Sequence, residues 1–253
     1  MRLKLEAVER EQVVALAKDT LFDKNGKDAL NWIKDFRKLK EDVIRKFEIG
    51  YVPSSIKNFD GDKHELAGRV IFPIRDNYGE LVAISSRDLN LVNSKEHNRG
   101  FWHESFDKSL YLYGLNLAKE HIIKHNKAIV VEGEIDTMAL WSRNINCSVG
   151  ILGSAISVYQ ISVLARYCNE IFVVSDSDIA GQQLLDRVDK IRKERNLDLS
   201  NIKVFLVRMP TPDILGEKNI SKVDPDWFLC NRKKEEFIEI LSETKHNSLI
   251  GIK

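Results

Sequence analysis

Acidic side chains follow apolar segments in the second half of the sequence, and their types and spacing suit metal-assisted phosphate chemistry. Glu132 follows the apolar run 129–131, and Asp176 and Asp178 follow the run 171–175. Carboxylates that share a site repel one another unless a cation compensates their charge. Hard oxygen ligands favour Mg²⁺ or Mn²⁺, with phosphates and water completing the coordination shell. We therefore expect a divalent-metal site that polarises phosphate oxygens and helps to activate an attacking hydroxyl.

Further acidic residues lie near these segments. Asp224 and Asp226 come after the apolar run 203–207, and Asp136 lies four positions after Glu132. A single acidic residue at the end of a strand is more often a helix cap or a solvated loop residue than a ligand. For Asp136 alone, the cap and the functional role are equally good interpretations, whereas several acidic residues that each follow a strand favour a site.

The elements that must position these residues alternate from residue 128 onward. Strands are expected at 129–131, 149–152, 171–175 and 203–207, and helices at 136–143, 158–167 and 180–194. This alternation predicts βαβ units and a parallel sheet, whose ligands bind beyond the carboxyl ends of the strands. We expect glycines to permit a positive φ or a close approach where strands turn toward helices, namely at Gly133, Gly153 and Gly181.

The rest of the sequence does not show this alternation of strands and helices. Helices are expected at 13–22, 29–39 and 42–47, with Gly50 as a stop signal, and again at 226–230 and 234–241. Two β-rich runs, 69–74 and 81–86, are joined by Arg-Asp-Asn-Tyr-Gly-Glu, which predicts a hairpin, and 90–107 is expected to be a long polar loop. The predicted fold is α/β, with an α+β subdomain at 1–127, a parallel-sheet domain at 128–210 and a helical segment at 211–253.

Composition narrows the class of protein. Hydrophobic residues make up 43% and charged residues 30%, as in ordinary globular proteins, and the formal net charge of +1 excludes an overall basic coat for nucleic acid but not a local basic groove. The three cysteines form no CxxC pair, which argues against a zinc ribbon or a disulfide framework. No apolar run is long enough to span a membrane, so we expect a soluble, cytoplasmic protein without a membrane partner.

The acidic motifs resemble the Toprim domain, which bacterial primases, topoisomerases and some nucleases share. The similarity is carried by Val131-Glu132-Gly133-Glu134-Ile135-Asp136, Leu152-Gly153-Ser154, Gln160, and Asp176-Ser177-Asp178 with Ala180-Gly181. In that domain the glutamate and the Asp-x-Asp pair surround catalytic metal. The resemblance alone leaves the reaction open, because the family both makes and breaks phosphodiester bonds.

Motifs around this domain resemble the catalytic core of bacterial, DnaG-like DNA primases, in collinear order from Asp28 to Leu229. They are 29–53, 69–76 with Gly79 and Arg87, Lys95 with Asn98, 108–115, and Asp224-Pro225-Asp226. The resemblance implies synthesis of short RNA primers on a single-stranded DNA template from ribonucleoside triphosphates. It implies Glu132, Asp176 and Asp178 as catalytic residues that bind metal together with Asp224 and Asp226, and Asp136 as support for the turn. It also implies nucleotide or DNA contacts from Arg69, Arg87, Lys95, Asn98 and Lys108.

The sequence departs from the primase pattern in places. Glu134 replaces an aromatic residue, Ser85-Ser86 replace glycines, and Glu96-His97 replace Tyr-Leu beside Lys95. The family's zinc module and helicase-binding domain have no counterpart, so we expect either an excised fragment or a minimal protein of phage or plasmid origin. A replicative helicase or a separate zinc-module protein is then the expected partner. The alternatives are a Toprim nuclease, a topoisomerase, which needs more domains, and a non-catalytic single-strand-binding subunit.

Overall fold

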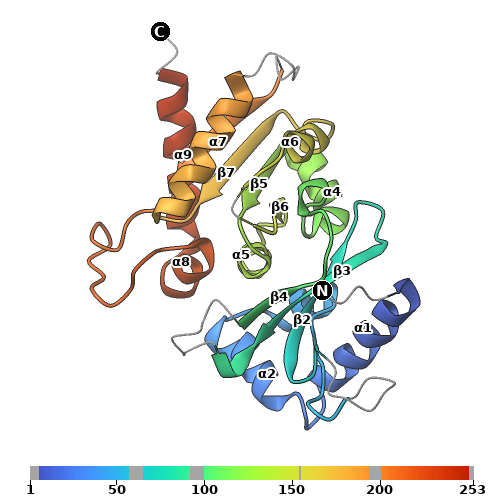
Figure 1. The fold of residues 1–253 in the computed structure, drawn as a ribbon. Coiled ribbons are helices and arrows are strands. Elements are labelled where there is room, and N and C mark those ends of the chain that lie inside the picture. The colour runs from blue at the N-terminus through green and yellow to red at the C-terminus, as the bar shows by residue number, and fades with distance from the viewer. Residues whose placement is uncertain (1–5, 57–64, 92–99, 154, 194–200, 251–253) are drawn as a thin grey trace. The chain divides into compact units, whose positions relative to one another are not determined.

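The computed structural model describes residues 6–56, 65–91, 100–153, 155–193 and 201–250, which separate into two compact units, Met1–Phe106 and Asp107–Lys253 (Figure 1). This boundary differs from the sequence-based ones at 127 and 210, and the three-part division stays a prediction. In the part of the chain that is described, no helix is both long and apolar enough to cross a membrane.

The first unit contains a four-stranded antiparallel sheet, among its described residues, with strand order β1-β2-β3-β4. The strands are β1 (Gly50–Tyr51), β2 (Arg69–Arg75), β3 (Leu81–Asp88) and β4 (Phe101–His103). The predicted hairpin is confirmed, because β2 pairs with β3. Its turn is held by Asp76, whose Oδ1 accepts hydrogen bonds from the amides of Tyr78 (2.8 Å) and Glu80 (3.0 Å), while Gly79 takes a φ of 97° that glycine tolerates best.

The helices of this unit are α1 (Ala7–Leu21), α2 (Lys27–Asn31), a π-helical turn (Trp32–Phe36) and α3 (Glu41–Lys46). In α1, Val14, Ala17 and Leu21 recur at helical spacing and are buried, and the first two belong to a core cluster with Ile71 and Ile84 of the sheet. The prediction of Gly50 as a helix stop was wrong. Helix α3 ends before Glu48, which takes a φ of 57°, and Gly50 begins β1. A Cβ on Gly50 would lie 2.5 Å from the Cβ of Ala17, so this glycine lets α1 approach the sheet.

The second unit contains the predicted parallel sheet, with strand order β6-β5-β7-β8 among its described residues. Its strands are β5 (Lys127–Val131), β6 (Ser148–Gly150), β7 (Glu170–Ser175) and β8 (Lys203–Arg208). The helices between them are α5 (Glu134–Trp141), α6 (Val158–Leu164) and α7 (Ile179–Lys193), followed by α8 (Pro225–Asn231) and α9 (Lys234–Ile250). Helix α7 packs on β7 and β8, α9 packs on β8, and α5 contacts α8 (Figure 1). The strands are almost entirely apolar, as expected for a sheet covered on both faces.

Besides β1, the sequence analysis missed helix α4 and strand β4. Helix α4 (Leu115–His125) precedes β5, and its buried residues Leu115, Ala118 and Ile122 do carry helical spacing. Strand β4 lies inside 90–107, which was expected to be a loop throughout. Three residues are too few to show an alternating pattern, so β4 is defined by its pairing with β3, from Ser85↔His103 to Arg87↔Phe101.

Candidate active site

The carboxyl ends of β5 and β7 bring the first two predicted carboxylates together. Glu132 directly follows β5 and Asp176 directly follows β7, and these two strands are parallel neighbours. An oxygen of the Glu132 carboxylate accepts a hydrogen bond from the backbone amide of Asp176 at 3.2 Å. Two segments 44 residues apart in sequence thus meet at the edge of the sheet where parallel α/β folds bind ligands.

Asp178 is placed by the start of α7. Its Oδ1 accepts a hydrogen bond from the amide of Gly181 at 2.8 Å. A Cβ on Gly181 would lie 2.1 Å from the carbonyl oxygen of Asp176, so only glycine fits where the first turn of α7 crosses the end of β7. The expected close approach is therefore present at Gly181. The expectation was wrong for Gly153, where a Cβ would meet nothing within 4 Å and the backbone has no left-handed φ.

Asp224 and Asp226 enter the site from the start of α8. The Asp224 carboxylate caps this helix by accepting a hydrogen bond from the amide of Trp227 at 2.7 Å. The amide of the buried residue Asp226 donates to Asp136 Oδ1 at 3.1 Å, and the amide of Gly133 donates to Asp136 Oδ2 at 3.3 Å. Asp136 thus ties the turn after β5 to the start of α8, and Thr137 adds a hydrogen bond from its hydroxyl to the carbonyl of Gly133.

These carboxylates perturb one another. Burial, followed by the charge of Asp176, raises the pKa of Glu132 to about 7. Burial also raises the pKa of Asp176 to about 6, with contributions from the charges of Asp224 and Asp178 and against the opposing effect of Lys222. Asp136 has its pKa raised well above the usual range by burial and by Asp224, Asp176 and Asp226. The edge of the sheet therefore carries more negative charge than the described side chains compensate.

Lys222 is a site residue that the sequence analysis missed. It lies in the loop between β8 and α8, and its ammonium is 2.5 Å from Asp176 Oδ2 and 3.8 Å from Asp178 Oδ2. Burial lowers the pKa of Lys222, but the hydrogen bond to Asp176 and the nearby carboxylates outweigh that effect and raise it. The only signal in the sequence was that Lys222 lies two residues before Asp224. This position belongs to no periodic pattern, so its relevance emerges only when the fold brings Lys222 beside the Asp-x-Asp segment.

The carboxylate oxygens at this edge of the sheet are chemically suited to bind a divalent ion. Asp176 is 4% exposed, and its Oδ1 is buried with no hydrogen-bond partner in the described part of the chain, so one hard oxygen remains available to a cation. Raised pKa values are also what uncompensated carboxylates show before a cation binds. Among the described residues, however, no three acidic, histidine or cysteine side chains converge closely enough to hold one ion jointly. These carboxylates are therefore adjacent without converging on one point among the described residues.

The predicted basic residues are held by contacts within their own units. In the first unit, Arg69 donates from Nε to Ser86 Oγ at 2.8 Å and from Nη2 to the carbonyl of Gly100 at 2.6 Å. Arg87 is 2% exposed and lies over the ring of Phe101 at 3.6 Å, so little of its side chain faces solvent, and its contact with nucleotide or DNA stays a prediction. Burial, with Arg37 and Arg69 nearby, lowers its pKa to about 10.

The other predicted binding residues divide between the second unit and the part of the chain that is not described. Lys108 lies in a short 3₁₀ helix with a partly exposed side chain, and its carbonyl accepts a hydrogen bond from Gln160 at 3.1 Å. Gln160, which belongs to the motif after β6, also donates to the carbonyl of Tyr111 at 2.6 Å, so this motif residue supports the chain around Lys108. Lys95 and Asn98 lie outside the described residues.

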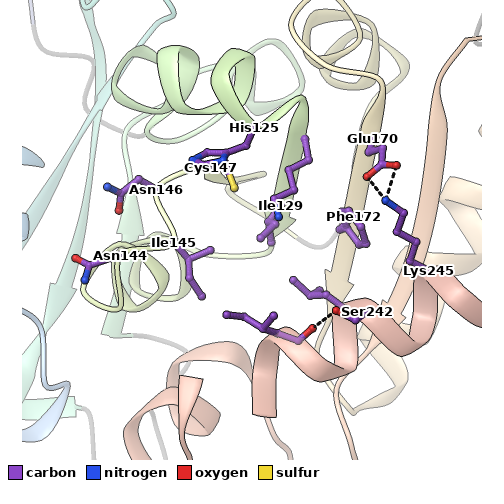
Figure 2. A pocket seen from close by; sticks show the side chains of 13 residues that line it. His125, Ile129, Asn144, Ile145, Asn146, Cys147, Glu170, Phe172, Ser242 and Lys245 are labelled. Atoms are coloured by element: carbon purple, nitrogen blue, oxygen red, sulfur yellow. Dashed lines mark hydrogen bonds and ion pairs between the residues drawn. The ribbon is translucent and has the colours of Figure 1, made fainter. Parts of the chain in front are cut away.

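A cavity of about 320 Å³ lies elsewhere in the second unit (Figure 2). Its lining includes Lys127 and Glu170, the first residues of β5 and β7, and Cys147, which directly precedes β6. Lys245 of α9 forms an ion pair with Glu170 at 2.7 Å across its wall (Figure 2). The cavity is therefore at the amino ends of the strands, opposite to the carboxylates, and the acidic edge rather than this cavity is the candidate active site.

Comparisons with known proteins show which sequences and folds this chain resembles. A family model described as Toprim-like matches residues 129–212, and a Toprim domain implies the use of divalent metal. The DNA primase of Buchnera aphidicola subspecies Baizongia pistaciae is 30% identical over 241 residues, which are 88% of this chain and 40% of that protein. The chain spans between 27% and 51% of the length of the curated DNA primases with which it was compared.

Solved structures show the same fold. The structure of a DnaG catalytic core has a TM-score of 0.76 at 22% identity, covering 95% of this chain and 82% of that one. A DnaG primase catalytic domain bound to single-stranded DNA has a TM-score of 0.74 at 22% identity, covering 97% of this chain and 84% of that one. The antiparallel sheet unit, the parallel Toprim sheet and the helices that follow it are thus the architecture of such cores.

Proposed function

We propose that this chain, which corresponds in sequence and fold to the catalytic core of DnaG-type DNA primases and contains a Toprim domain, synthesises short RNA primers on single-stranded DNA. In each step the 3′ hydroxyl of one nucleotide attacks the α-phosphate of the next, a phosphodiester bond forms and pyrophosphate leaves. The observation that carries the proposal is the hydrogen bond between Glu132 and the amide of Asp176, which joins the two acidic segments of the Toprim motif.

Divalent ions, for which we propose Mg²⁺ or Mn²⁺, would neutralise charge on the phosphate oxygens and help to activate the attacking hydroxyl. Glu132, Asp176, Asp178, Asp224 and Asp226 are the proposed ligands, directly or through bound water. The orphaned Oδ1 of Asp176 and the hard-oxygen character of the set support this assignment. We also propose Glu132 as an acceptor of the proton of the attacking hydroxyl, and the fact that its second oxygen is not used by the bond to Asp176 supports this role.

The template and the incoming triphosphates would contact the basic residues. Arg69, Arg87, Lys95, Asn98 and Lys108 are proposed for this role, in which arginine grips phosphate with two hydrogen bonds and lysine acts as a point charge. Of the described candidates, Arg69 and Lys108 have partly exposed side chains, whereas Arg87 would act by holding the β3–β4 region through its contact with Phe101. A replicative helicase or a zinc-module protein is the proposed partner, and its addition should raise primer yield.

The test is primer synthesis by the purified chain with single-stranded DNA, labelled ribonucleotides and Mg²⁺ or Mn²⁺. Asp176→Asn removes a proposed ligand while keeping the shape of the side chain, and Asp213→Asn changes an exposed residue of the β8–α8 loop as a matched control. RNA products that disappear only with Asp176→Asn support the proposal. DNA cleavage without RNA would indicate a Toprim nuclease instead, and DNA binding with neither reaction would indicate a non-catalytic subunit.

A further inference from the structure

Lys222 is fixed beside the Asp-x-Asp segment by the backbone around it. The amide of Val223 donates to Ser177 Oγ at 2.8 Å, and the amide of Ser177 donates to the carbonyl of Val223 at 3.0 Å. The β8–α8 loop is therefore anchored on Ser177, the residue between Asp176 and Asp178. The backbone of Lys222 is thus held at a position from which its ammonium reaches both carboxylates.

The ammonium uses oxygens that a metal ion would need. Its contact with Asp176 Oδ2 is to a side chain that is 6% exposed, and Asp178, at 3.8 Å, is its second neighbour. The other oxygen of Asp176 is buried and has no hydrogen-bond partner among the residues that the structure describes. A lysine ammonium carries one charge and three donors, whereas a divalent ion carries two charges and gathers six or more oxygens. The two cations cannot occupy the same position between these carboxylates.

This competition also explains the incomplete coordination shell. Among the described residues, no three potential ligands converge on one point, although six carboxylates lie at this edge of the sheet. The single charge of Lys222 offsets only part of their repulsion, and the ammonium takes up the position beside Asp176 and Asp178 toward which a divalent ion would draw the carboxylates. The side chain of Lys222 is 42% exposed, so it can turn toward solvent without any change of the core.

We propose that Lys222 is a built-in counter-ion of the metal site, which competes with the divalent ion for Asp176 and Asp178 and sets the metal concentration at which the site fills. The inference rests on the proposed metal site but not on primer synthesis. Lys222 is a positioning residue in this account, because it acts on the ligands and not on the substrate. A purely structural lysine would instead stabilise the arrangement that binds metal, and its removal would weaken binding.

The experiment is direct titration of the full chain with Mn²⁺, following free Mn²⁺ by electron paramagnetic resonance. Lys222→Met removes the charge and keeps most of the side-chain length, while Lys222→Arg keeps the charge. Lys218→Met removes the same charge from an exposed lysine of the same loop. We expect Lys222→Met to bind Mn²⁺ about tenfold more tightly than wild type, equivalent to about 1.4 kcal/mol. Lys222→Arg should stay within about twofold of wild type because it keeps the charge beside the carboxylates. Lys218→Met should also stay within about twofold, because the exposed charge that it removes is screened by salt.

Melting curves of the metal-free proteins show whether each variant is folded. The rise in Tm on adding Mn²⁺ reports binding of the ion to the folded protein. If Lys222→Met does not fold, Lys222→Gln is titrated in its place. Unchanged or weaker binding by the charge-removing variant overturns the inference, and so does equal tightening by Lys218→Met. Absence of Mn²⁺ binding in every protein overturns the metal site together with the inference. The predicted order of affinities in a chain that makes no RNA supports the inference and contradicts the proposed function alone.

Discussion

The carboxylate of Glu132 accepts a hydrogen bond from the backbone amide of Asp176 at 3.2 Å, across the neighbouring strands β5 and β7. Glutamine at position 132 can accept the same bond but has no charge for a cation or a proton. We expect Glu132→Gln to lower primer synthesis by about a hundredfold or more while leaving the fold intact. Single-turnover primer extension measures the rate, and Glu134→Gln, on the first turn of α5, is the control. Full activity of Glu132→Gln would contradict the assignment of Glu132 as a catalytic residue.

The stability of the metal-free protein should fall as pH rises. The pKa of Glu132 is raised to about 7, so the folded state holds this proton more tightly than the unfolded state does. Stability from this group is complete below the unfolded value of 4.5 and is lost as pH rises through about 7. In EDTA, the Tm of Glu132→Gln should therefore exceed that of wild type increasingly from about pH 5 to about pH 8. A constant difference across this range would contradict the assignment.

Asp224 has two separable roles. Its carboxylate caps α8 through the amide of Trp227 and is also a proposed metal ligand. Asn is as good an N-cap as Asp, whereas Ala is not, so Asp224→Ala should cost about 1 kcal/mol of stability and Asp224→Asn much less. Both variants should bind Mn²⁺ more weakly and make fewer primers. Chemical denaturation and Mn²⁺ titration separate the two effects, and normal Mn²⁺ binding by Asp224→Asn would leave only the cap.

Gly181 and Gly153 offer a matched comparison of the same substitution. A Cβ at Gly181 would lie 2.1 Å from the carbonyl oxygen of Asp176, whereas a Cβ at Gly153 would meet nothing within 4 Å. We expect Gly181→Ala to lower the unfolding free energy by about 2 kcal/mol or more, because backbone must move. Gly153→Ala should stay within about 0.5 kcal/mol of wild type. Urea denaturation measures both, and equal effects would show that α7 shifts easily.

A buried ion pair should control the stability of the first unit. Arg10 of α1 binds Glu104 with distances of 2.8–3.0 Å, and Glu104 Oε2 also accepts a hydrogen bond from the amide of Ile84 at 3.2 Å. Removing one partner leaves a buried charge, so Glu104→Ala should cost about 3–5 kcal/mol. The exposed pair of Glu41 and Arg45 is the control, and Glu41→Ala should leave the denaturation midpoint almost unchanged. A small effect of Glu104→Ala would mean that water reaches this pair.

The sequence by itself determined the parallel sheet, the β2–β3 hairpin and the carboxyl edge at which Glu132 and Asp176 meet. Each of these follows from local information, namely apolar runs of strand length that alternate with helical periodicity, and acidic residues placed directly after those runs. The spacing of Leu115, Ala118 and Ile122 also indicates helix α4, although the sequence analysis did not use it. The side of the sheet that carries the site therefore follows from chain order alone.

The tertiary structure alone decided which side chains complete that edge. Lys222 reaches Asp176 because the β8–α8 loop is pinned on Ser177, 46 residues away in sequence, and Asp136 bonds to the amide of Asp226, 90 residues away. Arg87 is buried over Phe101 because the short strand β4 pairs beside it. Such contacts join residues of unremarkable local sequence, and only the packing of distant segments brings their charges together.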